Sequence, residues 1–129
     1  MRMRIRLEAD AIYLILEHVR EAVYTLIVSP AHFAEIAATT HEQEGAQLLA
    51  FLDAYGNRPS WDLAKARERA EELYRLKFGP ADAAHVAFAE QAAAVFVTCD
   101  DALLKKSRRA KIKAVAMGPI EFSISEGLK

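Results

Sequence analysis

Residues 78–101 read FGPADAAHVAFAEQAAAVFVTCDD, and the rest of the chain is interpreted around them. The Gly-Pro pair at 79–80 breaks one helix and starts another, because proline suits the first helical turn. The small residues that follow predict a helix able to pack close to a sheet, and the apolar run at 94–97 is typical of a buried parallel strand. Asp82 falls in the first helical turn, and Asp100 directly follows the strand. Because ligands of open α/β folds bind at the carboxyl ends of strands, these carboxylates are the first functional indication.

Short apolar segments alternate with helical patterns on either side of this stretch. The apolar spacing over 7–23 predicts a helix, and β-rich runs at 25–28 and 113–116 predict further strands. This alternation favours an α/β domain with a mostly parallel central sheet flanked by helices. We expect 25–28, 94–97 and 113–116 to be parallel strands of that one sheet. Residues 1–6 alternate apolar and basic side chains, which fits either an edge strand or the start of a helix.

The segment between the first two predicted strands is expected to contain several helices. Residues 39–55 predict a helix, and residues 56–59, with the sequence GNRP, predict a loop. Ser60 is expected to cap a long charged helix that runs to Leu76, with Trp61 as a packing anchor near its start.

Length and composition narrow the class of protein. The 129 residues suffice for a single domain, 1–129, with its own core. The formal net charge of −1 gives no global reason to expect a nucleic acid or a membrane as partner. The apolar run at 11–16 is short, so we expect no membrane span and no signal peptide. The single Cys99 rules out an internal disulfide and fits the reducing cytoplasm, where we expect the protein to act.

Three acidic residues, Glu35, Asp82 and Asp100, lie at predicted junctions of strands and helices. If they converge on one rim of the sheet, they repel one another unless a cation lies between them. Mg²⁺ is held by a few carboxylates and several waters, and it can activate a water and stabilise a phosphoryl transition state. Each residue also has a structural explanation. Asp100 is a good helix N-cap, Asp82 can compensate the helix dipole, and Glu35 can be a solvated surface residue.

Two other side chains near these acids invite a chemical interpretation. His85, one turn after Asp82, can orient a site carboxylate, although a helix histidine that faces the core is the more common arrangement. Cys99 has no acid–base partner in the pattern, so it is interpreted as a small buried residue rather than a nucleophile.

Two parts of the chain resemble a PIN domain. The string ADAAHVA at 81–87, followed by VFVTCDD at 95–101, resembles the second half of that domain, and IVSPAHFAEI at 27–36 resembles its first half. The match covers nearly the whole chain in order and spacing. Its most specific part is the Asp-Ala-x-His-x-Ala element with the downstream Thr-x-Asp.

The resemblance implies a Mg²⁺- or Mn²⁺-dependent ribonuclease of the stand-alone, VapC-like kind, many of which are toxins of toxin–antitoxin pairs. It implies that Glu35, Asp82 and Asp100 are metal-site acids, that Asp101 is an auxiliary acid and that Thr98 lines the site. RNA and an antitoxin-like protein are the implied partners. A basic run follows the site and either forms a solvated face or neutralises RNA phosphates. It includes Lys105, Lys106, Arg108 and Arg109.

The chain departs from the family at its amino end. A PIN domain begins with a mid-sheet strand that ends in a metal-binding Asp, whereas residues 4–9 resemble the helix that follows this strand. We therefore expect a PIN-like fold with its N-terminal strand missing, weak metal binding and impaired RNA cleavage. We also expect a homo-oligomer that covers the open sheet edge through residues 1–6. The alternative is a non-catalytic PIN-fold protein that acts in assembly or partner binding.

Overall fold

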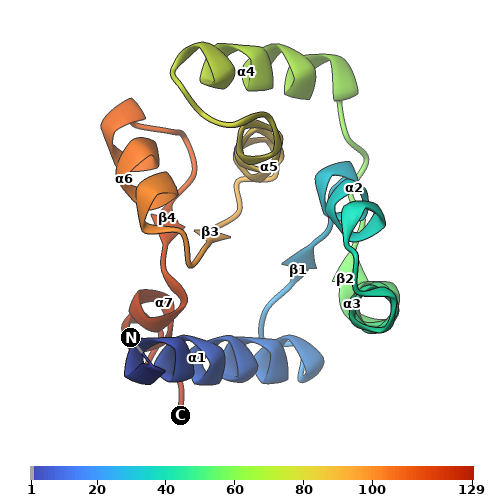
Figure 1. Cartoon of the computed structure of the whole chain (residues 1–129), viewed down its shortest axis with the longest axis vertical. Coiled ribbons are helices and arrows are strands. Elements are labelled where there is room, and N and C mark those ends of the chain that lie inside the picture. The colour runs from blue at the N-terminus through green and yellow to red at the C-terminus, as the bar shows by residue number, and fades with distance from the viewer. Residues whose placement is uncertain (1) are drawn as a thin grey trace. The chain divides into compact units, whose positions relative to one another are not determined.

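The computed structural model describes residues 2–129, most of which lie in helices (Figure 1). The elements are α1 (Arg2–Arg20), β1 (Leu26–Ile27), α2 (Pro30–Ala38), α3 (Glu42–Tyr55), β2 (Gly56–Asn57), α4 (Leu63–Arg75), α5 (Pro80–Gln91), β3 (Phe96–Val97), α6 (Asp101–Ala110), β4 (Ala116–Met117) and α7 (Pro119–Ser125). By its contacts the chain divides into two units, and each is described by itself. The middle unit is Thr25–Ala94, and the terminal unit combines the residues up to Tyr24 with Val95–Lys129.

The middle unit contains a short parallel strand pair. β1 pairs with β2 with Leu26 opposite Gly56, and the Val28 N–H donates to the Asn57 carbonyl at 2.8 Å. Gly56 is required because a Cβ at this position would overlap a methyl group of Val28 and the carbonyl oxygen of Leu52. The pairing therefore depends on a close approach that only glycine permits.

The core of the middle unit lies where α4 packs on α5. Figure 1 shows α4 lengthwise above α5, which is seen nearly end-on. The side chains of Leu73, Phe78 and Val86 are buried in this region. Arg69 of α4 forms a two-bonded ion pair with the buried carboxylate of Glu90 on α5, at 2.7 and 3.1 Å. Apolar burial and a bidentate pair thus hold α5 against α4.

The terminal unit joins segments from both ends of the chain. β3 pairs in parallel with β4, and α6 follows β3. α1 lies along α7 (Figure 1). The Tyr24 hydroxyl, just after α1, donates to Glu126 Oε1 at 2.9 Å, and its ring meets Phe122 edge-on at a centroid distance of 5.4 Å. These contacts attach the end of α1 to α7 and the residues that follow it.

The three predicted strands form, but not in one sheet. β1 lies within 25–28 and β3 within 94–97, whereas the strand predicted at 113–116 is shifted toward the carboxyl end as β4. Because β1 pairs with β2 and β3 with β4, residues 2–129 contain two separate two-stranded sheets, which corrects the prediction of a single central sheet. β2 falls in the predicted loop 56–59, where the glycine allows the approach to β1. The chain is α/β-like, mostly helical with two short parallel strand pairs.

The amino-terminal residues are helical. Of the two structures expected for residues 1–6, the structure shows a helix that begins at Arg2, while Met1 lies outside the described residues. None of the helices within residues 2–129 has both the length and the apolar character needed to cross a lipid bilayer.

α4 begins later than its sequence pattern predicts. Its N-cap is Asp62 rather than Ser60, because Asp62 Oδ1 accepts the Lys65 N–H at 3.0 Å. A carboxylate that bonds this backbone amide is a good helix cap, so the helix starts after Asp62. Trp61 packs edge-on against Phe88 with ring centroids 4.9 Å apart, which confirms it as a packing anchor.

Candidate functional site

The start of α2 is fixed by reciprocal hydrogen bonds. Ser29 follows β1 and is 2% exposed, and its hydroxyl oxygen accepts the Ala31 N–H at 3.2 Å. The Ser29 N–H in turn donates to His32 Nδ1 at 3.0 Å. His32 therefore takes the place that Glu or Gln usually has in a capping box. This arrangement holds the first turn of α2, and with it the His32 ring, at the end of β1.

Glu35 lies one turn further along α2 and contacts a histidine from α5. His85 Nε2 is 3.0 Å from Glu35 Oε1, and the side chains are 10% and 59% exposed, respectively. A carboxylate only accepts hydrogen bonds, so Nε2 carries the proton in this contact. His85 was expected either to face the core or to orient a site carboxylate, and here a nearly buried imidazole contacts the candidate acid Glu35.

His32 adjoins the same imidazole. The rings of His32 and His85 meet edge-on with centroids 4.9 Å apart. Burial lowers the pKa of His32, and the neighbouring His85 lowers it further. A neutral His32 fits its role as acceptor of the Ser29 N–H, because only an unprotonated Nδ1 accepts a hydrogen bond.

Asp82 belongs to the same unit as Glu35. It lies in the first turn of α5 and is half-buried, three residues before His85. Residues at this spacing share one side of a helix, so Asp82 and His85 lie on the same side of α5. The contact between His85 and Glu35 therefore brings two predicted site acids, Glu35 and Asp82, to one side of α5.

Asp100 has a structural role at the start of α6. It follows β3 directly, as predicted, and its Oδ1 accepts the Leu103 N–H at 3.1 Å. The Asp100 N–H donates to Thr98 Oγ1 at 3.1 Å. Asp100 is therefore the helix N-cap that the sequence allowed, and Thr98 supports the turn that presents it.

Asp101 is paired with a basic residue of α1. Arg4 Nη2 donates to Asp101 Oδ1 at 2.6 Å, and Arg4 Nε lies 3.8 Å from Glu8 Oε2. The hydrogen bond from Arg4 is the main reason why the pKa of Asp101 lies below its ordinary value. Both partners of the pair are more than half exposed, so water screens it.

Cys99 lies between Thr98 and the cap residue of α6 and is exposed, which corrects the prediction of a buried residue. It belongs to the turn between β3 and α6 rather than to either element. Partial desolvation raises the pKa of its thiol, and the carboxylate of Glu8 raises it further. The thiol is therefore protonated at neutral pH and is a poor nucleophile.

The basic residues of α6 are mostly solvated: Lys105, Arg108 and Arg109 are exposed, and Lys106 is half-buried. Leu103 and Leu104 are buried instead, so α6 is amphipathic. Arg108 Nη2 lies 3.0 Å from Glu121 Oε1 at the start of α7 and is thus already ion-paired. Contact between these cations and RNA phosphates stays a prediction.

The predicted site residues are divided between the two units. Glu35 and Asp82 belong to the middle unit, whereas Thr98, Asp100 and Asp101 belong to the terminal unit. Convergence of the acids on one metal ion stays a prediction, and within residues 2–129 no group of three or more His, Cys, Asp or Glu side chains is arranged to hold a metal. Mg²⁺ is commonly bound through one or two carboxylates with water and phosphate oxygens, so Glu35 and Asp82 stay the predicted metal ligands of the middle unit.

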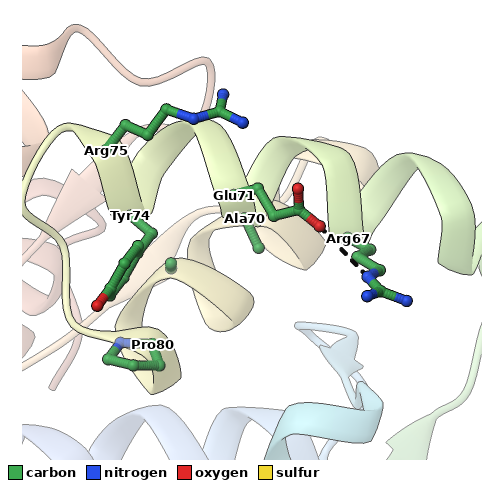
Figure 2. Close-up of a pocket in the computed structure, with 7 residues that line it drawn as sticks. Arg67, Ala70, Glu71, Tyr74, Arg75 and Pro80 are labelled. Atoms are coloured by element: carbon green, nitrogen blue, oxygen red, sulfur yellow. Dashed lines mark hydrogen bonds and ion pairs between the residues drawn. The ribbon is translucent and has the colours of Figure 1, made fainter.

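The middle unit also has a shallow hollow of about 500 Å³ between α4 and α5 (Figure 2). It is lined by Arg67, Ala70, Glu71, Tyr74, Arg75, Pro80 and Ala83. In Figure 2 the Tyr74 ring points toward Pro80, and Arg67 pairs with Glu71 at 3.3 Å. By helical spacing, Pro80 and Ala83 lie on a different side of α5 from Asp82, so the hollow is separate from the acids.

Sequence reasoning missed two features of this region. One is the role of His32, whose only signal was its position three residues after Ser29, where a capping box has Glu or Gln. The other is the hollow, whose signal was the helical spacing of Arg67, Glu71 and Tyr74 on α4.

Comparisons of the chain with protein-family models, with curated proteins and with solved structures find no match, so its local geometry and its sequence are the basis for any functional assignment.

Proposed function

We propose that the chain is a PIN-like, metal-dependent ribonuclease that hydrolyses RNA phosphodiester bonds. The observation that carries this proposal is the contact between Glu35 and the nearly buried His85, one turn after Asp82 on α5. The contact with His85 orders an exposed carboxylate, which costs side-chain conformational entropy. Divalent cations such as Mg²⁺ bind to carboxylates. The PIN-like motifs at 27–36, 81–87 and 95–101 supply the specific family.

Glu35, Asp82 and Asp100 are the proposed ligands of a Mg²⁺ or Mn²⁺ ion, with Asp101 as an auxiliary acid. When bound, such an ion lowers the pKa of a water and stabilises the charge that develops on the phosphate. Thr98 lines the site and holds the Asp100 backbone. The exposed cations of α6 are proposed to neutralise the RNA backbone on either side of the cleaved bond.

The resemblance to PIN domains and the exposed residues of α1 also suggest partners for the chain. We propose an antitoxin-like protein as regulator, and a homo-oligomer formed through the first turns of α1. The support for the oligomer is the exposure of Met3, Ile5 and Leu7, large apolar side chains that are more than half exposed. The cytoplasm is the proposed compartment, because the single thiol of Cys99 has no partner within the sequence for a disulfide.

The test is cleavage of single-stranded RNA by purified protein in the presence of Mn²⁺. Asp82→Asn is expected to abolish cleavage, because it removes a charged ligand while keeping the shape of the side chain. Asp62→Asn is the matched control: it removes one charge from the same unit and keeps the cap of α4, since Asn caps as well as Asp. Cleavage that survives Asp82→Asn would contradict the proposed site and indicate a contaminating nuclease.

The alternative function is non-catalytic assembly on a PIN-like fold. It is favoured by the terminal unit, where Asp100 caps a helix and Asp101 is paired with Arg4. Carboxylates with such partners are less available to a metal. This alternative predicts that the unaltered protein neither cleaves RNA nor binds Mn²⁺, and that it forms oligomers which depend on Met3 and Leu7.

A further inference from the structure

The environment of His85 differs from that of an ordinary surface histidine. Its side chain is 10% exposed, yet its Nε2 contacts a carboxylate whose side chain is 59% exposed. The imidazole is therefore held within the unit while its outward nitrogen reaches a solvated group. A glutamate without such a partner samples several rotamers, and ordering it costs conformational entropy.

A chain of contacts keeps the imidazole of His85 in place. Ser29 is buried at the end of β1 and donates its N–H to His32 Nδ1. The His32 ring then packs edge-on against His85. On the other side, Val86 next to His85 is fully buried, so α5 is anchored at this point. His85 is thus supported by two helices, α2 and α5.

The contact also distinguishes the two oxygens of Glu35. Oε1 lies at His85 Nε2, so the carboxylate can rotate only by giving up this contact. The exposure of the side chain leaves Oε2 accessible from solvent. Asp82 lies on the same side of α5 as His85.

We propose that His85 is the positioning residue of Glu35: it binds Oε1 and thereby presents Oε2 to the divalent cation of the proposed function. This inference rests on the proposed function for the identity of the cation, but the ordering of Glu35 by His85 does not. Outer partners that orient a ligand in this way typically change metal affinity by about 10–100-fold when they are removed.

The first experiment is calorimetric titration with Mn²⁺. His85→Ala is expected to weaken binding about 10-fold, and His85→Gln is expected to restore most of it, because the Gln amide can donate from a similar place. His41→Ala is the control, since His41 is an exposed histidine of the same unit whose side chain makes no capping bond. The fluorescence of Trp61 checks that each variant is folded.

A double substitution separates positioning from a general structural effect. If His85 acts through Glu35, His85→Ala has no further effect on Mn²⁺ affinity in a protein that already carries Glu35→Ala. A structural role would weaken binding by the same factor in both backgrounds. Equal factors, or full affinity in His85→Ala alone, would overturn the proposal while leaving the ribonuclease assignment intact.

A measurement without metal distinguishes failure of this inference from failure of the proposed function. Side-chain couplings of Glu35 in NMR spectra are expected to report one rotamer in the unaltered protein and in His85→Gln, and averaged rotamers in His85→Ala. If the unaltered protein binds no Mn²⁺ but shows this pattern, the metal function fails and the positioning by His85 stands. Averaged couplings in the unaltered protein would overturn the positioning itself.

Discussion

The junction of β1 with α2 and the junction of β3 with α6 are built alike, but their acidic side chains have different partners. In both, a two-residue parallel strand leads into a helix whose first turn is capped by a side chain, Ser29 or Asp100. At the first junction, Glu35 is held by a histidine that is 10% exposed. At the second, Asp101 is paired with Arg4, which is 52% exposed. A buried donor orders a carboxylate, whereas an exposed arginine neutralises it and is screened by water.

The largest expected effect comes from loosening the helix that carries His85. Leu73 is fully buried in the core of the middle unit, so Leu73→Ala should lower the free energy of unfolding by about 2–5 kcal/mol. Trp61 is the only tryptophan and packs on Phe88 of α5, so its fluorescence during urea unfolding reports on this unit. In Leu73→Ala the side chain of Glu35 should become less ordered, whereas the amide chemical shifts at the junction of β3 with α6 should stay unchanged.

Leu76→Ala is the matched control for this change. Leu76 lies three residues further along and is about half exposed, so its truncation should change the free energy of unfolding by less than about 0.5 kcal/mol. If both substitutions had the same effect, the packing of α4 on α5 would not be what supports the first junction.

The next effect separates the structural role of Asp100 from a chemical one. Asp100→Ala removes the cap of α6 and should cost about 1 kcal/mol of unfolding free energy in thermal denaturation. Asp100→Asn should keep the stability, because Asn caps a helix as well as Asp does. The proposed metal site predicts that both substitutions impair RNA cleavage, whereas a residue that only caps would impair it in Asp100→Ala alone.

The two junctions also show what could be predicted from the sequence. The proline at the first position of α5 and the apolar run before Thr98 are local signals. They predict α5 and β3 close to where these elements lie. The partner of β1 was missed because Gly56 and Asn57 have the composition of a turn, and only the close approach to Val28 explains their pairing. Sheet membership is set by such long-range contacts, which periodicity does not encode.

For the candidate site as well, the sequence predicts the features that depend on local residues but not those that depend on long-range contacts. The positions of Asp82 and Asp100 at helix starts follow from local sequence, and so does the cap that Asp100 forms. The contact of His85 with Glu35 joins residues 50 positions apart (85 − 35), and the pairing of Arg4 with Asp101 spans 97. The spacing of neighbouring residues in the sequence predicts neither of these two contacts. Sequence can therefore place the acids on their elements but cannot assign their partners.

A smaller effect concerns pH and the first junction. The folded pKa of His32 lies below its ordinary value of 6.5, because burial and His85 disfavour its charged form. Between the folded and ordinary values, the unfolded chain binds more protons, so the free energy of unfolding should fall as pH is lowered through about 6.5. In metal-free buffer, His32→Gln should reduce this dependence and keep the cap, since Gln is the usual residue at this position. The exposed His41→Gln should leave the dependence unchanged.

The smallest expected effect is at the second junction, where Arg4 lowers the pKa of Asp101. Arg4→Gln should raise that pKa toward its ordinary value of 3.8, measured by NMR titration of the Asp101 carboxyl carbon. A folded pKa below the unfolded one means that the stabilisation is present above the ordinary value and is lost as pH falls through the folded value. Because both side chains are exposed, salt at about 1 M should reproduce part of the shift by screening the pair.

Arg2→Gln is the control for this last prediction, because Arg2 is an exposed arginine on the same helix and is absent from the causes that shift Asp101. It should leave the pKa of Asp101 unchanged. If Arg4→Gln also left it unchanged, Arg4 would not be the neutralising partner, and the contrast between the two junctions would be lost.

If the pKa rises as expected, the Asp101 carboxylate of Arg4→Gln has lost its arginine partner. The Mn²⁺ affinity of this variant should then increase if Asp101 is an auxiliary acid of the metal site. An unchanged affinity would remove Asp101 from the proposed ligands and leave Glu35 and Asp82 as the centre of the site.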